Sequence, residues 1–324
     1  MTLGKQHKGI GKLIQLELDR ISAIQPSMEK TPLALRLAFQ RLHFLSWQER
    51  VLLLENIHDM EDFLALGLAE IESFLYRSMH ARPLDMGKIW EQAERDINIL
   101  DRLGARFVCV VDKDYPPLLR EIHRAPFGLF VRGDTKALNQ ASVTMVGTRS
   151  PTSRGLYTAQ LLAKETADEG IVIVSGIARG IDAASHRGAI QSGAAATIAV
   201  LPCGPERVYP SSNAALAAKI LDSGGCLVTE YPPGVSLDRY RFPERNRILA
   251  GFSKLTLVVE APEKSGALIT AEIALSEGRD VAVAASCLGS SRNSGADALK
   301  EDGALAIKAG AELIPMIRCE YNGI

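Results

Sequence analysis

Apolar residues recur along this chain with two different periods, and the change falls near residue 104. From about Ile10 to Gly104 they return every three or four positions, as in the segments LALRLAFQRL, ERVLLLENI and MEDFLALGLAEIESFL. This spacing places apolar side chains on one face of a helix. We therefore predict a small helical domain over residues 1–104.

After residue 104 the apolar residues form short continuous runs. A first strand is expected at Phe107–Val111 and a second in LFVRGD, with the turn DKDYPPLL between them. Further strands are expected at Val143–Val146, Ile171–Val174, Thr197–Leu201, Leu227–Glu230, Leu255–Glu260 and Val281–Ala284. Helical stretches separate them at Leu156–Asp168, Asp182–Gln191, Asn213–Asp222 and Ala267–Glu277. Strands therefore alternate with helices over most of this region.

Strands that are apolar throughout are buried on both faces, and their alternation with helices is typical of a parallel, doubly wound sheet. The sequence thus predicts an α/β fold, with a Rossmann-like and mainly parallel sheet in a domain over residues 105–324. In such sheets ligands bind beyond the carboxyl ends of the strands. The loops that follow the predicted strands are therefore where a functional site is expected.

Four of these loops have the composition of anion sites. They read GTRSPTSRG after Val146, SGIARGID after Val174, PCGPERVYP after Leu201 and APEKSGALIT after Glu260. Backbone N–H groups and a helix N-terminus attract anions at such turns, and glycines allow close backbone approach. The glycines are Gly147, Gly176, Gly180 and Gly266, and the arginines placed to close over a phosphate are Arg149 and Arg179. One such turn is also explained by packing alone, but four at one sheet edge favour a site.

A local excess of positive charge points to the same ligand class. The 324 residues carry a net charge of −1, yet Ser236–Lys254 contains five arginine and lysine residues and two acidic residues. Guanidinium groups bind phosphate oxygens in pairs, and a ring such as Phe242 gives a base a flat face for stacking. This segment, interpreted as a loop, predicts single-stranded nucleic acid as the ligand. The alternative is a solvated loop whose arginines pair with nearby carboxylates.

Several classes of protein are not favoured. No run of 18 apolar residues and no signal-peptide pattern is present, so we expect a cytoplasmic protein that does not enter a membrane. The five cysteines form no CxxC pair, which favours reduced, buried thiols over a metal site. Neither GxGxxG nor GxxxxGK[ST] occurs, so no dinucleotide cofactor and no P-loop hydrolysis of ATP is expected. Ser175 lacks a GxSxG context and His186 is interpreted as a packing residue, so no catalytic group is predicted.

The same segments resemble the DNA-processing protein A family, DprA or Smf, over about residues 101–303. The motifs, in family order, are DKDYPPLLREI, LFVRGD, VGTRSPTSRG, SGIARGIDAASHRGAI, YPSSN, TEYPPG, RFPERNRILAG and SGALITAEIAL. The resemblance implies an extended Rossmann fold, a homodimer and no catalytic turnover. It also implies a protein that protects incoming single-stranded DNA and helps to load the RecA recombinase in natural transformation and homologous recombination.

The resemblance also implies roles for individual residues. Arg149 and Arg179 would contact phosphates, Phe242 would stack on a base, and Ser265 and Gly266 would supply a helix N-terminus. Arg241, Arg245, Asn246 and Arg247 would line the pocket. The predicted site also includes Gly147, Thr148, Ser175, Gly176 and Gly180.

Some features depart from the family, and one alternative remains. Ala284-Ala285 and Gly295-Ala296-Asp297 differ from the usual loop sequences, no winged-helix-like module is evident at the C-terminal end, and the helical part resembles a sterile-alpha-motif-like domain only loosely. The alternative is a nucleotide phosphoribohydrolase-like enzyme with a related Rossmann core. Thr270 occupies the position where that family has its catalytic glutamate, so acid or base assistance has no evident donor.

Overall fold

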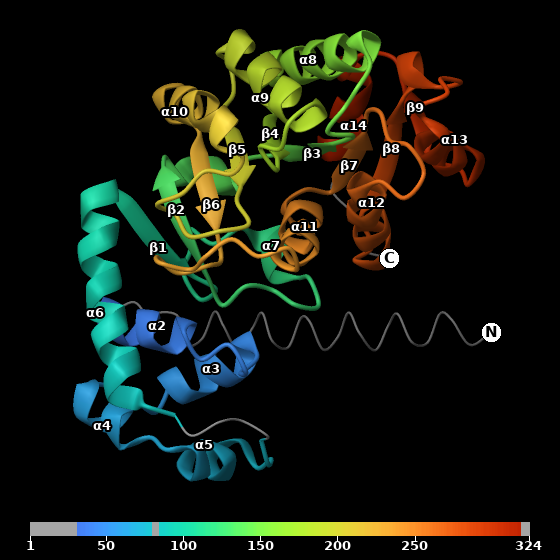
Figure 1. Ribbon diagram of the computed structural model, residues 1–324. Coiled ribbons are helices and arrows are strands. Elements are labelled where there is room, and N and C mark those ends of the chain that lie inside the picture. Colours follow the sequence, from blue (N-terminus) through green and yellow to red (C-terminus); the bar gives the residue numbers. More distant parts are fainter. Residues whose placement is uncertain (1–30, 80–83, 319–324) are drawn as a thin grey trace, which may run out of the picture.

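The computed structural model describes residues 31–79 and 84–318. Helices form the first part of the chain, and the sheet with its covering helices forms the rest (Figure 1). The first helices are α2 (Leu33–Gln40), α3 (Trp47–Leu54), α4 (Met60–Ala65), α5 (Leu68–Leu75) and α6 (Met86–Leu103). This helical region agrees with the apolar spacing of the sequence.

The helical region is held to the sheet by polar contacts and by a shared apolar core. Arg36 of α2 forms an ion pair of 2.5 Å with Asp112, and Gln40 Nε2 donates a hydrogen bond of 2.7 Å to the carbonyl oxygen of Glu230. One cluster of buried apolar residues runs from Leu35 and Phe39 to Val228 of the sheet. The division into two domains at residue 104 stays a prediction.

The sheet has nine strands in the order β1-β2-β6-β5-β4-β3-β7-β8-β9 among the residues that the structure describes. They are β1 (Ala105–Cys109), β2 (Gly128–Gly133), β3 (Ser142–Val146), β4 (Val172–Ser175), β5 (Thr197–Val200), β6 (Cys226–Thr229), β7 (Leu255–Val258), β8 (Asp280–Ala284) and β9 (Leu305–Ile307). The neighbouring strands β6, β5, β4, β3, β7, β8 and β9 run parallel to one another. Strand β2 runs antiparallel to both of its neighbours, β1 and β6. The predicted α/β fold with a mainly parallel sheet is confirmed.

Helices cover both faces of this sheet (Figure 1). One face packs against α8 (Ser153–Asp168), α9 (Ile181–Ser192), α10 (Ala214–Asp222) and α14 (Leu313–Arg318). The other face packs against α7 (Pro117–Arg120), α11 (Arg241–Phe252), α12 (Gly266–Ser276), α13 (Ser294–Glu301) and the helical region. Both faces need this cover because side chains alternate between them along a strand. In β3, Val143 and Met145 enter the apolar core on one face, while Val146 enters the core on the other face.

Strand order reverses between β3 and β7. The chain proceeds from β3 through β4 and β5 to β6, and then returns to place β7 on the opposite side of β3. Such a reversal leaves a crevice at the carboxyl ends of the two strands, where ligands bind in open α/β sheets. The loops after β3 and β7 are therefore the first place to look for a site.

Several parts of the structure differ from the sequence-based expectation, among them helix α7, which begins within the predicted turn DKDYPPLL, and helix α14, which was not predicted. The segment interpreted as a loop is helix α11, in which Pro243 falls in the first turn, where its missing N–H is not needed. β9 was not predicted, because its three residues are too few for a clear pattern. Gly295 and Ala296, which the sequence analysis placed in a loop, lie in the first turn of α13, and the N–H groups of both donate to the carbonyl oxygen of Ala261.

Candidate functional site

The loops after β3, β4 and β7 meet at the point where strand order reverses. Thr148 N–H donates to the carbonyl oxygen of Glu260 at 2.7 Å, and its own carbonyl oxygen accepts from Ile181 N–H at 3.2 Å. Gly180 has a φ of 78°, and a Cβ there would collide with the Thr148 carbonyl oxygen. Glycine is therefore required at this position both for its backbone conformation and for the close approach of the loops.

A cavity of about 460 Å³ lies between these loops, α11 and α12, and a smaller one of about 270 Å³ adjoins it. Both are lined by Arg149, Ala178, Phe242 and Arg245, so we treat them as one site, the switch-point cleft. Predicted site residues in its lining are Gly147, Thr148, Arg149, Gly176, Arg179, Phe242, Arg245, Asn246, Ser265 and Gly266. The cleft thus brings together residues from four separate segments of the chain.

The mouth of the cleft combines exposed arginines with an aromatic ring. The guanidinium carbon of Arg149 lies 5.3 Å from the ring centroid of Phe242, and the edge of Tyr209 meets the same ring at 5.4 Å. Arg149 and Arg179 are exposed, and neither has an ion-pair partner within residues 31–79 and 84–318. Their hydrogen-bond donors are therefore available to an anionic ligand, beside a ring on which a base can stack.

The floor of the cleft contains a buried arginine. Arg245 is 4% exposed, and its Nη1 donates to the carbonyl oxygen of Val200 at 2.8 Å. Burial lowers the pKa of Arg245 and raises the pKa of Asp182, while the charge of each residue opposes the shift of the other. A Cβ at Gly176 would collide with this guanidinium. Gly176 therefore makes room for Arg245, which supplies positive potential from below.

The helix N-termini at this edge are not equivalent, which differs from the expectation of four similar anion sites. At α8, Glu260 accepts from Thr152 N–H at 3.0 Å and from its hydroxyl at 2.6 Å. At α9, Asp182 accepts from Ala178 N–H at 3.3 Å. These turns already hold a carboxylate of this chain. Among the described residues, no carboxylate is bound at the start of α12 at Ser265 and Gly266, and a Cβ at Gly266 would meet no atom of theirs within 4 Å.

The structure places four predicted site residues outside the cleft lining, namely Ser175, Gly180, Arg241 and Arg247. Gly180 lies behind the lining, against the carbonyl oxygen of Thr148. Ser175 is fully buried, and its hydroxyl donates to the carbonyl oxygen of Met145 at 2.6 Å. Arg241 and Arg247 lie on the opposite face of α11, because residues 242, 245, 246 and 249 of the helix line the cleft. Arg241 donates to the carbonyl oxygen of Ser236, and Arg247 forms an ion pair with Glu230.

Sequence reasoning missed three residues that shape the cleft. Asn213 Nδ2 donates to the carbonyl oxygens of Ile177 at 2.8 Å and Ala178 at 3.2 Å, which holds Ile177 at a φ of 54°. Lys264, with a φ of 62°, and Tyr209 also line it. The YPSSN motif contains both Tyr209 and Asn213 and was the available signal, but only the folded chain brings it to this edge.

The cleft offers little for metal binding or for the alternative enzyme. Within the described ranges, no three His, Cys, Asp or Glu side chains gather as a metal site would require. Thr270 is 1% exposed in the cleft wall, and its hydroxyl donates to the carbonyl oxygen of Gly266 at 3.4 Å. The predicted free, buried thiols are confirmed for four cysteines, namely Cys109, Cys203, Cys226 and Cys287.

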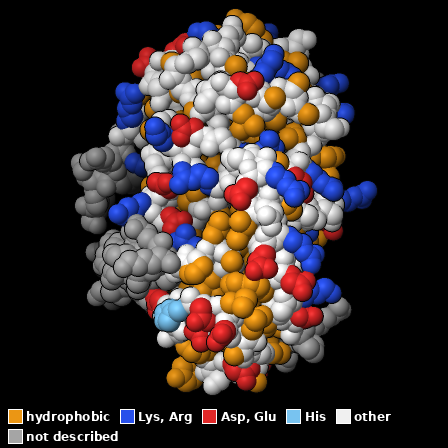
Figure 2. All heavy atoms as spheres, turned by 90° about the vertical axis from the view of Figure 1, so that its left-hand side faces the viewer, with side chains coloured by type: hydrophobic (Ala, Val, Ile, Leu, Met, Phe, Trp, Pro, Cys, Tyr) orange, Lys and Arg blue, Asp and Glu red, His pale blue; other side chains and the backbone are white. Residues whose placement is uncertain are grey.

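Charge is mixed on the face of the molecule that Figure 2 shows. On the face around α6, Lys and Arg side chains are interspersed with Asp and Glu, and apolar side chains gather over the helical region (Figure 2). None of the helices in the described residues is both long and apolar enough to span a membrane. Attraction of a polyanion therefore depends on a focused patch such as the cleft mouth.

Comparisons with known proteins point to one family. The sequence model of the family described as DNA recombination-mediator protein A matches residues 106–318. Protein Smf of Escherichia coli is 39% identical over 200 residues, covering 62% of this chain and 53% of that protein. The DNA processing protein DprA of Bacillus subtilis is 40% identical over 179 residues, covering 55% of this chain and 60% of that protein. The matches therefore span little more than half the length of these two relatives.

Longer matches exist as well. Protein Smf of Borreliella burgdorferi is 31% identical over 288 residues, 88% of each chain. The structure of DprA from Streptococcus pneumoniae superposes with a TM-score of 0.71 at 29% identity, covering 90% of this chain and all of that one. A structure of DprA from Helicobacter pylori, described for its single-stranded DNA binding mode, gives a TM-score of 0.58 at 27% identity and covers 65% of this chain and 94% of that one.

Proposed function

Because the chain belongs to the DNA recombination-mediator protein A family, we propose that it binds single-stranded DNA in the switch-point cleft and passes it to the RecA recombinase. The observation that carries this proposal is the pair of exposed arginines, Arg149 and Arg179, beside the ring of Phe242, which form no ion pair with any residue that the structure describes. Phosphate contacts hold the strand, and ring stacking accepts any base. The biological setting that we propose is homologous recombination and natural transformation in the cytoplasm.

In this proposal, different residues of the cleft contact different parts of the DNA strand. Arg149 and Arg179 contact phosphates at the mouth, and Phe242 stacks on one base between them. The open N-terminus of α12 at Ser265 and Gly266 holds a further phosphate, since its N–H groups and partial positive charge face the cleft. Buried Arg245 adds positive potential, and Asn246, whose Nδ2 donates to the Gly266 carbonyl oxygen at 3.4 Å, ties α11 to that turn.

This function requires no chemical step. We propose that the protein acts as a homodimer without catalysis, metal or cofactor, by protecting DNA and presenting it to RecA. Incubating the protein with nucleoside 5′-monophosphates and measuring released base tests this directly. We expect no release, because Thr270 supplies neither a general acid nor a general base. Released base would favour the phosphoribohydrolase alternative.

The central experiment is fluorescence anisotropy of labelled oligonucleotides, single-stranded and duplex, at several salt concentrations. Arg149→Ala/Arg179→Ala should weaken single-strand binding by about a hundredfold or more, since each charged hydrogen bond contributes about 1.5–3 kcal/mol. Affinity of the unaltered chain should fall by about 0.7 log units per log unit of salt for each phosphate neutralised.

The matched control is Arg95→Ala/Arg102→Ala, which removes the same charge from exposed positions on α6. It should bind DNA nearly as well as the unaltered chain. If both double variants lost affinity equally, binding would depend on net charge rather than on the cleft. Sedimentation of both variants with RecA then tests whether the RecA surface lies inside or outside the cleft. RecA binding that survives loss of Arg149 and Arg179 would place the RecA surface outside the cleft.

A further inference from the structure

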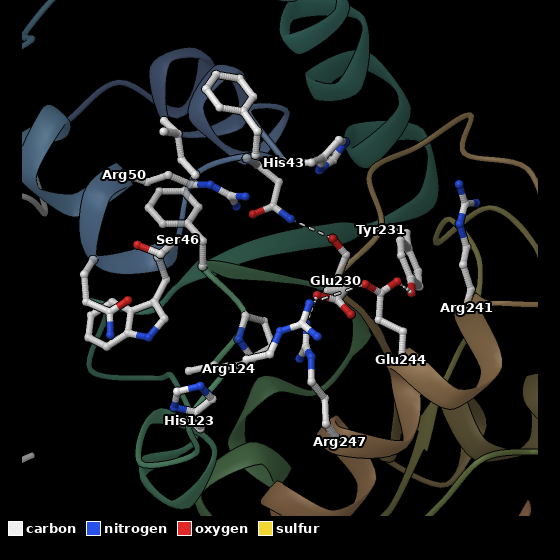
Figure 3. A pocket seen from close by; sticks show the side chains of 18 of the residues that line it. His43, Ser46, Arg50, His123, Arg124, Glu230, Tyr231, Arg241, Glu244 and Arg247 are labelled. Carbon is white, nitrogen blue, oxygen red and sulfur yellow. Dashed lines mark hydrogen bonds and ion pairs between the residues drawn. The ribbon is translucent and has the colours of Figure 1, made fainter. Parts of the chain in front are cut away.

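A second cavity, of about 510 Å³, lies on the other side of α11. We call it the junction cavity, because α2, α3 and the loop between them form one wall while α11, the residues after β6 and residues 123–127 form the other (Figure 3). Its volume is in the range of sites that enclose small organic ligands. None of the functions proposed above uses it.

The charges that line the junction cavity do not balance. Four arginines, Arg50, Arg124, Arg241 and Arg247, face two glutamates, Glu230 and Glu244. Arg247 pairs with Glu230, and Arg124 lies 3.8 Å from Glu244 (Figure 3). Two positive charges are therefore left over. Partial burial, followed by the charges of Arg50, Arg41 and Arg241, lowers the pKa of His43 at the rim, which agrees with a positive potential inside.

Arg50 is the anomaly among these residues. It is 8% exposed, its Nε donates to the carbonyl oxygen of Leu42 at 3.1 Å, and its guanidinium carbon lies 5.5 Å from the ring centroid of Phe127. It forms no ion pair in the described part of the chain, and its Nη groups donate no hydrogen bond there. Figure 3 shows its guanidinium directed into the cavity. Buried charges are normally paired, because removing an isolated charge from water is costly.

Other buried donors in the lining also lack acceptors. Arg247 Nε and Nη1 and Trp47 Nε1 are inaccessible to solvent, and no acceptor for them lies within the described residues. Burial lowers the pKa of Arg50 to about 10, with the charge of Glu230 opposing this shift and that of Arg247 adding to it. Arg50 and Arg247 both line the cavity, but only the Nη groups of Arg50 have no acceptor among the described residues and are not shut off from this space. An anion with several oxygens would satisfy the donors of Arg50, and the charge of Arg247 would add to the attraction.

We propose that the junction cavity binds a small phosphate monoester, with its phosphate on the guanidinium group of Arg50. Guanidinium groups match phosphate oxygens in geometry and charge. The organic part of the ligand would lie against the rings of Phe44, Tyr231 and Tyr240, which suits the base of a nucleoside 5′-monophosphate. The ligand would join α3 to α11, whose opposite face carries Phe242 of the switch-point cleft.

Tryptophan fluorescence offers a local readout. The chain has two tryptophans, Trp47 in the cavity lining and Trp90 in α6. In a Trp90→Phe chain, Trp47 is the sole reporter, and titration with AMP should change its emission in a saturable way. Inorganic phosphate should produce a weaker but saturable change, and adenosine, which lacks the phosphate, should bind at least tenfold more weakly than AMP.

Variants test which residues hold the phosphate. In the Trp90→Phe background, Arg50→Gln should weaken AMP binding at least tenfold while circular dichroism shows the fold intact. Arg124→Gln is the second variant, since its side chain is 69% exposed and its loss should not unfold the chain. It should weaken AMP binding about threefold by reducing the positive potential.

The outcomes separate this site from the DNA site. Arg149→Ala/Arg179→Ala should retain the AMP response of Trp47 even where single-strand binding is lost. An AMP response abolished by that double variant would mean that the phosphate binds in the switch-point cleft, and the proposal would be wrong. It would equally be wrong if neither AMP nor phosphate changed Trp47 emission, or if Arg50→Gln and Arg124→Gln both bound AMP normally.

Discussion

The two faces of α11 use arginine in opposite ways. On the face toward the switch-point cleft, the arginine of the helix itself is buried, while Arg149 and Arg179 from the neighbouring loops are exposed and unpaired in the described residues. On the face toward the junction cavity, Arg247 pairs with Glu230, and Arg241 is bonded to Ser236 and lies over the rings of Tyr231 and Tyr240. One face has free donors at the sheet edge within the described residues, whereas the other has mostly engaged donors around a partly open cavity.

The difference teaches that the density of arginine in a sequence does not identify the arginines that meet a polyanion. An arginine meets a polyanion when it lies exposed at the carboxyl edge of the sheet. A long strand of nucleic acid needs exposed donors along an open path, and the cleft mouth provides them. A partly open cavity of small volume that contains a buried arginine suits a small ligand instead. Each prediction below tests this division.

The largest expected effect concerns the ion pair behind the junction cavity. Glu230→Gln should lower the free energy of unfolding by about 3 kcal/mol, because it leaves the largely buried Arg247 without its counter-charge. Urea denaturation measures this change. The same variant should bind single-stranded DNA normally in anisotropy measurements.

Glu244→Gln is the matched control for that variant. The arginine partner of Glu244 is 69% exposed, so the loss should be about 1 kcal/mol or less. If Glu230→Gln weakened DNA binding as strongly as it weakened stability, the two faces of α11 would not act independently, and the comparison would fail.

Most strands of the sheet could be predicted from the sequence. The division of the arginines between the two faces of α11 could not. Strands such as β3 and β4 are apolar on both sides, so periodicity alone locates them within about two residues. The anion turns were located for the same reason, since they follow those strands. Occupancy of the turns by Glu260 and Asp182 could not be predicted, because these carboxylates reach them only through tertiary contacts.

The helix within residues 236–254, the segment rich in arginine, was not predicted for a different reason. Its apolar residues Ile248, Leu249 and Phe252 give a helical period only when Pro243 is accepted within the first turn. Interpreted as a loop, the segment directs all of its arginines to one ligand. As helix α11, it sends Arg241 and Arg247 to one side and Arg245 to the other.

A further prediction concerns a buried histidine between α9 and the start of β5. His186 is fully buried, and its Nδ1 lies 2.8 Å from the hydroxyl oxygen of Thr197. That hydroxyl donates to the carbonyl oxygen of Ile173, so Nδ1 carries the proton and Nε2 has no partner among the described residues. Burial, and then the charges of Arg245 and Arg187, lower the pKa of His186 to about 3.

The sign of the pH dependence follows from this lowered pKa. The unfolded chain binds a proton at His186 near pH 6.5, whereas the folded chain does not until about pH 3. Stability from this residue is therefore complete above pH 6.5 and is lost as the pH falls, by about 2 kcal/mol between pH 7 and pH 5. Urea denaturation at both values should show that His186→Gln loses less stability on acidification. Identical losses in both chains would mean that the buried site of His186 tolerates the added charge.

The smallest effect comes from two adjacent residues on opposite faces of α11. Phe242→Ala should weaken single-strand binding about tenfold, since a stacking ring contributes roughly 1–3 kcal/mol. Arg241→Ala removes a full positive charge from the next position, yet it should change the affinity less than twofold because its side chain points toward the junction cavity. Anisotropy at one fixed salt concentration compares the two directly. A larger loss for Arg241→Ala than for Phe242→Ala would mean that charge density, rather than the face of the helix, governs DNA binding. The division of α11 into two functional faces would then have to be abandoned.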